Sequence, residues 1–180
     1  MGNVDLDKYQ QIASLIKDLD NIQWQNSQVA GTDDYRNWVP VINLLEDEET
    51  LTGVSESGYW VLKYDNHISF LSDDKYLRDL LPCLKKSLNE LHIQIDEELK
   101  KKQIPITVKD TFPIKGLVLT GLKSKSEFWA ALALNWLEHI TIDNQIREQL
   151  QQIVKAKWAS QKTRQKASKF LKGKIKQKAS

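Results

Sequence analysis

The side chains with the most distinctive chemistry in this chain lie in its last 26 residues, which are strongly basic. From Lys155 to Ser180 there are ten Lys or Arg residues and no Asp or Glu, whereas the preceding 154 residues carry a net charge of −8. Clustered cationic groups bind phosphates and other anions, because each neutralised phosphate releases counterions. The candidate binding residues are therefore the basic side chains of this segment and one tryptophan: Lys155, Lys157, Trp158, Lys162, Arg164, Lys166, Lys169, Lys172, Lys174, Lys176 and Lys178.

The basic segment is compatible with several partners. Nucleic acid is one of them, and we expect such binding to be non-specific, because only Trp158 and Phe170 offer rings for base stacking. An acidic protein fits equally well. The segment can also be solvated or docked on the acidic part of its own chain. A membrane surface fits less well, because the apolar face of this segment is narrow and short.

Residues that commonly support catalysis are few in this sequence. The three histidines, His67, His92 and His139, are far apart, and no H-x-x-x-H or C-x-x-C pattern is present. Zinc or a Cys/His nucleophile would have to be assembled from distant residues. Cys83 lies in a leucine-rich segment and is expected to be buried and inert. We therefore expect no enzyme, no cofactor, no metal and no small-molecule substrate.

Three short patterns approach known site motifs without matching them. Residues 116–124 resemble the phosphate-binding pattern G-x-x-x-x-G-K-[ST], but Leu122 separates the second glycine from the lysine. Residues 96–100 contain an E-x-K pattern of the kind found in metal-dependent nucleases, which requires a strand where we expect a helix. The acidic run 46–49 lacks the ligand spacing of a divalent-cation site.

The composition is that of an ordinary globular protein. The 180 residues fit one domain, or one domain with an appendage, and are 41% apolar and 28% charged. A single cysteine excludes an internal disulfide and fits a reducing compartment. The first residues lack the pattern of a signal peptide, and the longest apolar run is Phe128 to Leu134. We therefore expect a cytoplasmic protein that does not insert into membranes.

The most legible structural element is the stretch from Ser124 to Ile140. Ser124 and Glu127 have the S-x-x-E spacing of a capping box, which marks the start of a helix. The residues that follow are apolar on most faces of a helix, which is typical of a helix enclosed by neighbours. This stretch predicts a buried central helix near residues 125–140.

Other amphipathic segments predict helices around it. Apolar spacing predicts helices over 5–19 and 84–99, and a second helical stretch over 32–45 that Pro40 kinks. Residues 21–31 show no period and are predicted to form a loop. Towards the C-terminus, Thr141 or Asp143 is expected to cap one helix, and Ser160 is expected to cap the last.

Residues 59–71 are the best candidate for β-structure. Their aromatic and β-branched residues surround Asp65-Asn66, which can form a two-residue hairpin turn. The sequence does not decide between strand and helix for 59–71 or for 91–122. The resulting prediction is a mainly α fold of stacked amphipathic helices with a small β-hairpin near 59–71. It comprises an acidic body over 1–154 and a basic helix or tail over 155–180, which can pack on that body.

Taken together, these features predict a non-enzymatic protein that binds another macromolecule. The leading hypothesis is that the chain binds a partner protein, as an adaptor, inhibitor, immunity protein or accessory subunit does. The contact would be made by the basic segment or by exposed aromatic residues. The alternative is a nucleic-acid-binding accessory protein that uses the basic C-terminal segment. A metal-dependent nuclease is a second and weaker alternative. The identity of the partner and the oligomeric state are not encoded in any pattern that we recognise.

Overall fold

The computed structural model describes residues 3–20, 22–45 and 50–173. The chain divides into two compact units. The first, the barrel unit, comprises residues 1–76 and 89–113, and the second, the helical unit, comprises residues 77–88 and 114–180. This division differs from the boundary that charge alone suggested, which separates residues 1–154 from residues 155–180. The separate basic helix or tail over 155–180 stays a prediction.

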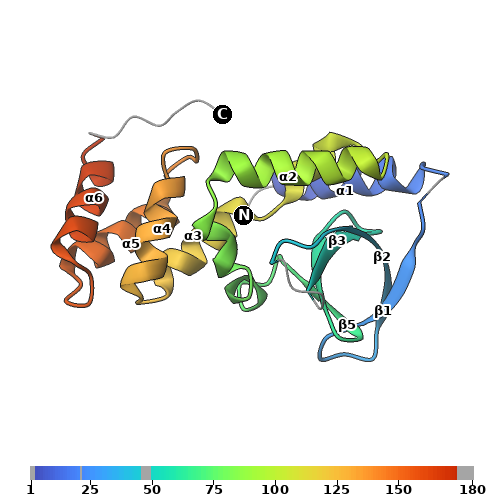
Figure 1. Cartoon of the computed structure of the whole chain (residues 1–180), viewed down its shortest axis with the longest axis horizontal. Coiled ribbons are helices and arrows are strands. Elements are labelled where there is room, and N and C mark those ends of the chain that lie inside the picture. Colours follow the sequence, from blue (N-terminus) through green and yellow to red (C-terminus); the bar gives the residue numbers. More distant parts are fainter. Residues whose placement is uncertain (1–2, 21, 46–49, 174–180) are drawn as a thin grey trace. The chain divides into compact units, whose positions relative to one another are not determined.

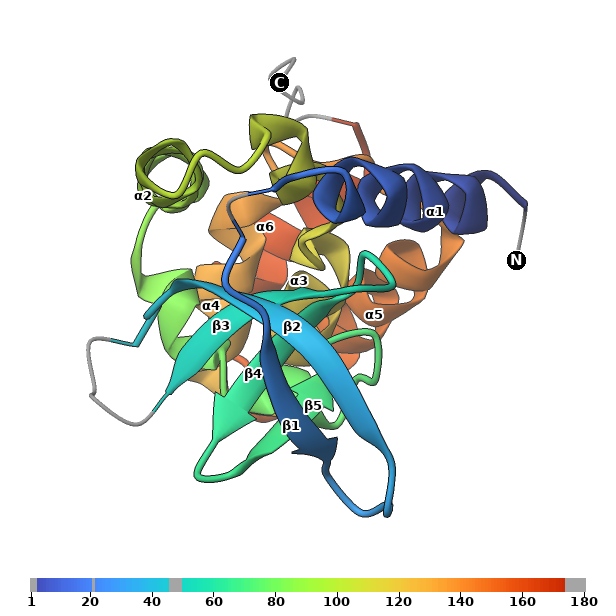
Figure 2. The same ribbon diagram turned by 90° about the vertical axis from the view of Figure 1, so that its right-hand side faces the viewer.

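The barrel unit contains a closed five-stranded β-barrel, so the prediction of a mainly α fold is wrong. Its strands are β1 (Gln25–Val29), β2 (Tyr35–Ile42), β3 (Leu51–Ser55), β4 (Trp60–Tyr64) and β5 (His67–Phe70). Neighbouring strands pair antiparallel in chain order, and a short parallel pairing of β1 with β5 closes the barrel (Figures 1 and 2). The predicted hairpin at 59–71 is confirmed as β4 and β5, but it is only part of a larger sheet.

The hydrophobic core of the barrel includes a buried tryptophan on β2. Trp38 is fully buried with Val61 and Ile68, and its indole Nε1 donates to the hydroxyl of Ser27 at 3.0 Å. Strand β3 approaches Trp38 so closely that a Cβ on Gly53 would lie 2.6 Å from its ring and 2.2 Å from the Val39 carbonyl oxygen. Only glycine therefore fits at residue 53 without moving the neighbouring strand.

Two stretches of this barrel were assigned wrongly from the sequence. The predicted loop over 21–31 contains β1, and the predicted helix over 32–45 is β2, in which Pro40 lies at an irregularity of the pairing with β3. A proline is tolerated at such a place because the ladder is already interrupted there. The acidic run 46–49 lies outside the described residues.

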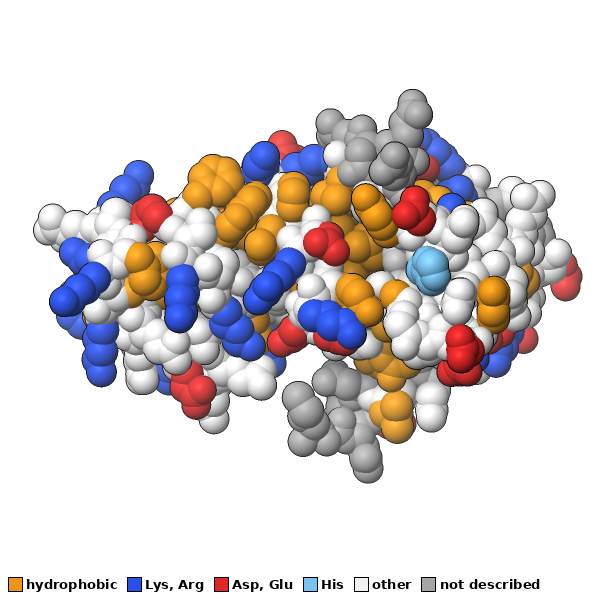
Figure 3. Space-filling model, turned by 90° about the horizontal axis from the view of Figure 1, so that it is seen from below, with side chains coloured by type: hydrophobic (Ala, Val, Ile, Leu, Met, Phe, Trp, Pro, Cys, Tyr) orange, Lys and Arg blue, Asp and Glu red, His pale blue; other side chains and the backbone are white. Residues whose placement is uncertain are grey.

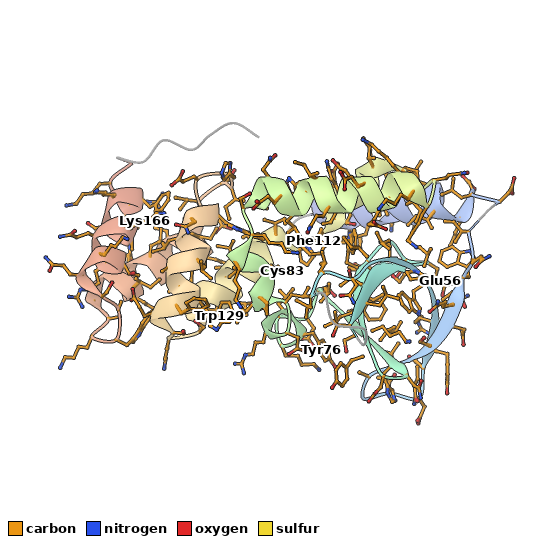
Figure 4. The ribbon with its side chains drawn as sticks, in the orientation of Figure 1. Glu56, Tyr76, Cys83, Phe112, Trp129 and Lys166 are labelled. Atoms are coloured by element: carbon orange, nitrogen blue, oxygen red, sulfur yellow. The ribbon has the colours of Figure 1, made fainter. Side chains whose placement is uncertain are left out.

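Helical segments of the same unit lie along one side of the barrel (Figures 1 and 2). They are α1 (Asn3–Lys17), α2 (Leu88–Lys101, from Asn89 onward) and the 3₁₀ turn η3 (Ile106–Thr111). Tyr9 of α1 stacks on Tyr59 with ring centroids 4.0 Å apart. The Trp60 indole donates to the Val108 carbonyl oxygen at 3.2 Å and meets Phe112 edge to face (Figure 4). The helix predicted over 5–19 is confirmed.

The region 91–122, which the sequence left open, is helical apart from a connecting segment. Helix α2 buries Leu91, Ile95 and Leu99, as its apolar spacing predicted, but it begins at Leu88. The 3₁₀ turns η1 (Tyr76–Arg78) and η2 (Leu81–Lys85) precede it. Residues 106–111 in the middle of this region form η3, so they are not a strand.

Within the described residues, the helical unit contains η2 and four α-helices. These are α3 (Ile114–Lys123), α4 (Glu127–Trp136), α5 (Asn144–Lys155) and α6 (Gln161–Leu171). Helices α3 and α4 pack closely at Gly121, where a Cβ would lie 2.9 Å from the Ala133 Cβ. Trp136 is 2% exposed, and its indole donates to the Lys86 carbonyl oxygen at 2.9 Å.

The helix predicted over 124–140 is present, but it is shorter and is capped by a different serine. Ser126, not Ser124, accepts from the Trp129 backbone N–H, while the Ser124 hydroxyl donates to the Gly121 carbonyl oxygen at the end of α3. The helix is also not enclosed on every side, since Phe128 is 53% exposed. A capping-box spacing therefore located the helix start to within two residues.

Candidate functional site

Formal charge follows the division into two units. The barrel unit carries 19 Asp or Glu against 9 Lys or Arg, a net charge of −10, and the helical unit carries 5 against 17, a net charge of +12. The small net charge of the whole chain conceals this separation. Two surfaces of opposite sign attract different classes of partner.

The basic surface is built on the hairpin of α5 and α6. Asp143 caps α5 by accepting from the Ile146 N–H at 3.0 Å, and Ser160 caps α6 by accepting from the Thr163 N–H at 3.2 Å. Both caps confirm the sequence prediction, which had left Thr141 open as an alternative to Asp143. Residues 144–173 contain eight Lys or Arg and a single acidic residue, Glu148. The face drawn in Figure 3 shows Lys and Arg side chains gathered over this end of the helical unit.

A carboxylate from α4 fixes the start of α6. Glu127 accepts from the Ser160 N–H and from the Ser160 and Thr163 hydroxyls, at 2.7, 2.7 and 2.6 Å. Burial alone would raise the pKa of Glu127, but these hydrogen bonds, with a contribution from nearby Arg164, hold the pKa below its ordinary value. The ionised carboxylate also complements the positive end of the α6 dipole. Helix α6 is therefore held in a defined position.

Two of the predicted binding residues serve this same purpose. The Arg164 guanidinium donates to the carbonyl oxygens of Ala156 and Ala159, at 3.2 and 2.6 Å, and so fastens the turn before α6. The Lys166 ammonium donates to the Asn135 side chain on α4 at 2.6 Å and lies 3.7 Å from the Glu138 carboxylate (Figure 4). Both cations hold the hairpin together, so they are less free to meet a partner.

The remaining face of α6 is exposed and lacks acidic residues. Its buried side consists of Thr163, Ala167 and Phe170. At 100° per residue, the exposed side chains fall within an arc of about 100° on the other side. They are Gln161, Lys162, Gln165, Lys169 and Lys172. Lys162 and Lys169 are seven residues apart, which places them about 10 Å apart along the same face.

The other predicted residues lie beside this face or outside the described chain. Lys155 and Lys157 are exposed at the turn between the two helices, and Trp158 is half-buried there. Lys174, Lys176 and Lys178 lie outside the described residues. Phe170, considered for base stacking, is buried and cannot serve that role.

This face has an aromatic and basic neighbour that was not predicted from the sequence. Because Glu127 reaches Ser160, the loop before α4 lies close to the turn before α6. That loop carries exposed Lys125 and is followed by exposed Phe128, whose ring meets Trp129 edge to face (Figure 4 labels Trp129). Only the K-S-K-S-E pattern at 123–127 hinted at this cluster, and the sequence analysis used it solely as a helix start.

Two of the three short patterns that approach known site motifs lie within the described residues, and neither of these two forms a site. Residues 116–123 belong to α3, so no phosphate-wrapping loop exists there. Glu98 and Lys100 lie on α2, where the nearby ion pair joins Glu98 to Lys101 instead. Burial raises the pKa of the Cys83 thiol to about 11, which keeps it protonated (Figure 4). Within the described residues, no three His, Cys, Asp or Glu side chains are grouped so as to hold a metal ion.

The comparisons with known proteins give no further guide. No protein-family model matches the chain, and neither the curated proteins nor the solved structures gave a match. Among the described residues, no helix is both long enough and apolar enough to cross a membrane. The site is therefore interpreted from its own residues alone. They form a helical hairpin that presents ammonium and amide groups on one face.

Proposed function

We propose that this protein is a non-enzymatic accessory protein that binds nucleic acid through the basic face of α5 and α6. The observation that carries the proposal is the exposed lysine set Lys155, Lys157, Lys162, Lys169 and Lys172, for which the described residues provide no ion-pair partner. Nucleic acid is a polyanion of closely spaced phosphates, and neutralising these phosphates with lysines releases counterions, which favours binding.

The hydrogen bonds of the hairpin support the proposal. Glu127, Arg164 and Lys166 are each hydrogen-bonded to other groups of the helical unit, so they hold α6 in place without covering its lysine face. A helix 11 residues long is about 16 Å in length and can follow several phosphates. Glutamines 161 and 165 add neutral donors and acceptors that can contact phosphates or base edges.

A partner protein, the leading hypothesis from the sequence, stays a second proposal. Its support is the exposure of tyrosine side chains on the barrel unit, since aromatic residues dominate interface energetics. A cytoplasmic location belongs to the same proposal and is supported by the single, buried cysteine, which does not require an oxidising compartment.

The test compares two triple variants of equal charge change. Lys162→Gln/Lys169→Gln/Lys172→Gln removes three cations from α6, and Lys100→Gln/Lys101→Gln/Lys102→Gln removes three from the end of α2 in the barrel unit. Binding of fluorescein-labelled 20-base-pair duplex and 20-nucleotide single-stranded DNA is measured by anisotropy at 50 and 200 mM salt.

With about five phosphate contacts, the affinity of the unmodified protein is expected to fall between these salt concentrations by a factor on the order of 10² to 10³. The α6 variant should lower the slope of log affinity against log salt by about three, and the α2 variant should leave it unchanged. Equal losses in both variants would mean that net charge alone drives the binding. No binding by the unmodified protein at 50 mM salt would end the proposal.

A further inference from the structure

The barrel carries an aromatic row that the nucleic-acid proposal does not use. The strand registers place four residues side by side: Tyr35 pairs with Gln28, Gln28 with His67, and His67 with Tyr64. They belong to β2, β1, β5 and β4, in that order. Residues paired laterally point to the same face of a sheet. The pairing therefore defines one row across four strands, with a tyrosine at each end.

This row points away from the barrel interior. Ser27 and Ile68, which adjoin Gln28 and His67 in their strands, are buried, and alternate residues of a strand point to opposite faces. Tyr35 is 57% exposed and Tyr64 is 60% exposed, so both rings lie in solvent. The Gln28 side chain donates to the Thr32 carbonyl oxygen at 2.7 Å, which holds it in place in the middle of the row.

The surroundings of the row are acidic. The β1–β2 turn precedes Tyr35 and the β4–β5 turn follows Tyr64, at opposite ends of the barrel (Figure 2), and the two turns carry the exposed residues Asp33, Asp34 and Asp65. Asp34 pairs with Arg36 at 3.2 Å, whereas no ion pair engages Asp33 or Asp65 within the described residues. The whole barrel unit carries a net charge of −10, so a polyanion is repelled from this face.

Aromatic rings beside carboxylates bind organic cations. A guanidinium or ammonium group is attracted to the face of a tyrosine ring, and a nearby carboxylate adds to that attraction. We propose that the row Tyr35–Gln28–His67–Tyr64 binds a basic, extended peptide segment of a partner protein through its Arg or Lys side chains.

The geometry also sets the spacing of the cations in that segment. Tyr35 and Tyr64 lie three strand spacings apart, which amounts to about 14 Å along the row. An extended chain covers that distance in about four residues, and residues i and i+4 of an extended chain point to the same side. The preferred segment therefore carries two Arg or Lys side chains four residues apart.

The experiment titrates three 12-residue Gly/Ser peptides into the isotopically labelled full-length protein and follows its backbone amide signals by NMR. One peptide has Arg at residues 5 and 9, one has Arg at residues 5 and 6, and one has Glu at residues 5 and 9. The protein variants are Tyr35→Ala/Tyr64→Ala and, as a matched loss of an exposed ring in the helical unit, Phe128→Ala. Unchanged amide signals elsewhere show that each variant is folded.

We expect the 5,9-Arg peptide to shift the amides of the row and to bind about tenfold more weakly to the double tyrosine variant, with no change for Phe128→Ala. The adjacent-Arg peptide should bind several-fold more weakly than the 5,9-Arg peptide, and the Glu peptide should not bind. Equal affinity of the 5,9-Arg peptide for the unmodified protein and the double variant overturns the proposal, as does equal binding of the Glu peptide. Equal binding of the two Arg peptides overturns the spacing.

A second variant addresses the carboxylates without altering the rings. Asp33→Asn/Asp65→Asn keeps the side-chain shapes, and asparagine accepts the positive φ of 51° at residue 65. This variant should bind the 5,9-Arg peptide with about threefold lower affinity, and the binding should depend less on salt. An unchanged affinity contradicts the role of the acidic turns. Duplex DNA binding should be the same in the tyrosine variant as in the unmodified protein, which separates this proposal from the nucleic-acid proposal.

Discussion

The barrel unit and the helical unit differ in both charge and construction. The barrel unit, with a net charge of −10, is closed by pairing strands and by contacts such as that between Trp60 and Val108, which are 48 residues apart. The helical unit, with a net charge of +12, is built from consecutive helices whose starts are fixed by their own caps. One chain thus carries two units of opposite net charge, and surfaces of opposite sign attract different classes of partner.

The difference in construction predicts different responses to substitution. In the helical unit the largest buried side chain near the middle of the packing is Trp136, which bridges α4 to the end of η2. In the barrel unit the tightest point is a glycine, Gly53, where the backbone leaves no room for a side chain. We therefore expect the helical unit to be most sensitive to the removal of side-chain volume and the barrel unit to be most sensitive to its addition.

The largest effect is expected for Trp136→Ala. Removing a buried tryptophan leaves a cavity and deprives the Lys86 carbonyl oxygen of its donor, so the free energy of unfolding should fall by about 3–5 kcal/mol. Urea denaturation followed by circular dichroism, with hydrogen exchange of the α3–α6 amides, measures the loss. Phe128→Ala, an exposed ring on the same helix, is the control and should cost less than about 1 kcal/mol. Equal effects of the two substitutions would show that α4 is not the packed centre of this unit.

The same difference in construction explains which elements the sequence revealed. The caps Asp143 and Ser160 and the apolar spacing of α2 are local signals, and each was recognised. Strand β1 has the sequence QNSQV, with Val29 as its one apolar residue, and its buried Ser27 contacts the core through a hydrogen bond from the Trp38 indole. Such a strand can be recognised only when the neighbouring strands of the sheet are known.

Strand β2 was mistaken for a helix for a related reason. Its residues are buried on both faces from Trp38 onward, so the alternation that marks a half-buried strand is absent. The remaining apolar spacing of Trp38, Val41 and Ile42 resembles one face of a helix. For the site, the basic segment was evident from composition, but the sequence could not show that Arg164 and Lys166 are used to fasten α6. Nor could it place Tyr35 and Tyr64 at the two ends of one row, because that arrangement depends on three strand pairings.

The second largest effect is expected for Gly53→Ala. The added Cβ would meet the Val39 carbonyl oxygen and the Trp38 ring, so β2 and β3 must move apart at a cost of about 1–3 kcal/mol. Faster hydrogen exchange should appear across the strands of the barrel and not in α3–α6. Gly31→Ala is a useful comparison, because Gly31 has a positive φ but no atom near its Cβ position, so the strain should stay within the β1–β2 turn. Faster exchange in α3–α6 would show that the two units do not unfold separately.

The smallest effect, and the one that depends on pH, is expected for Glu127→Gln. Its hydrogen bonds to Ser160 and Thr163 hold the pKa of Glu127 below its ordinary value, so the carboxylate stabilises the fold when it is ionised. That contribution is fully present above the ordinary pKa of a glutamic acid, about 4.3, and is lost as the pH falls through the lowered pKa of the folded state. We expect the variant to be about 1 kcal/mol less stable at pH 7, and the difference from the unmodified protein to shrink towards zero well below pH 4. Chemical denaturation at pH 7, 5 and 3 measures this difference. Glu148→Gln, at an exposed residue of α5 that forms no ion pair with the described residues, serves as the control. A difference that grows as the pH falls would contradict the assignment, since it would require Glu127 to be held protonated at the start of α6.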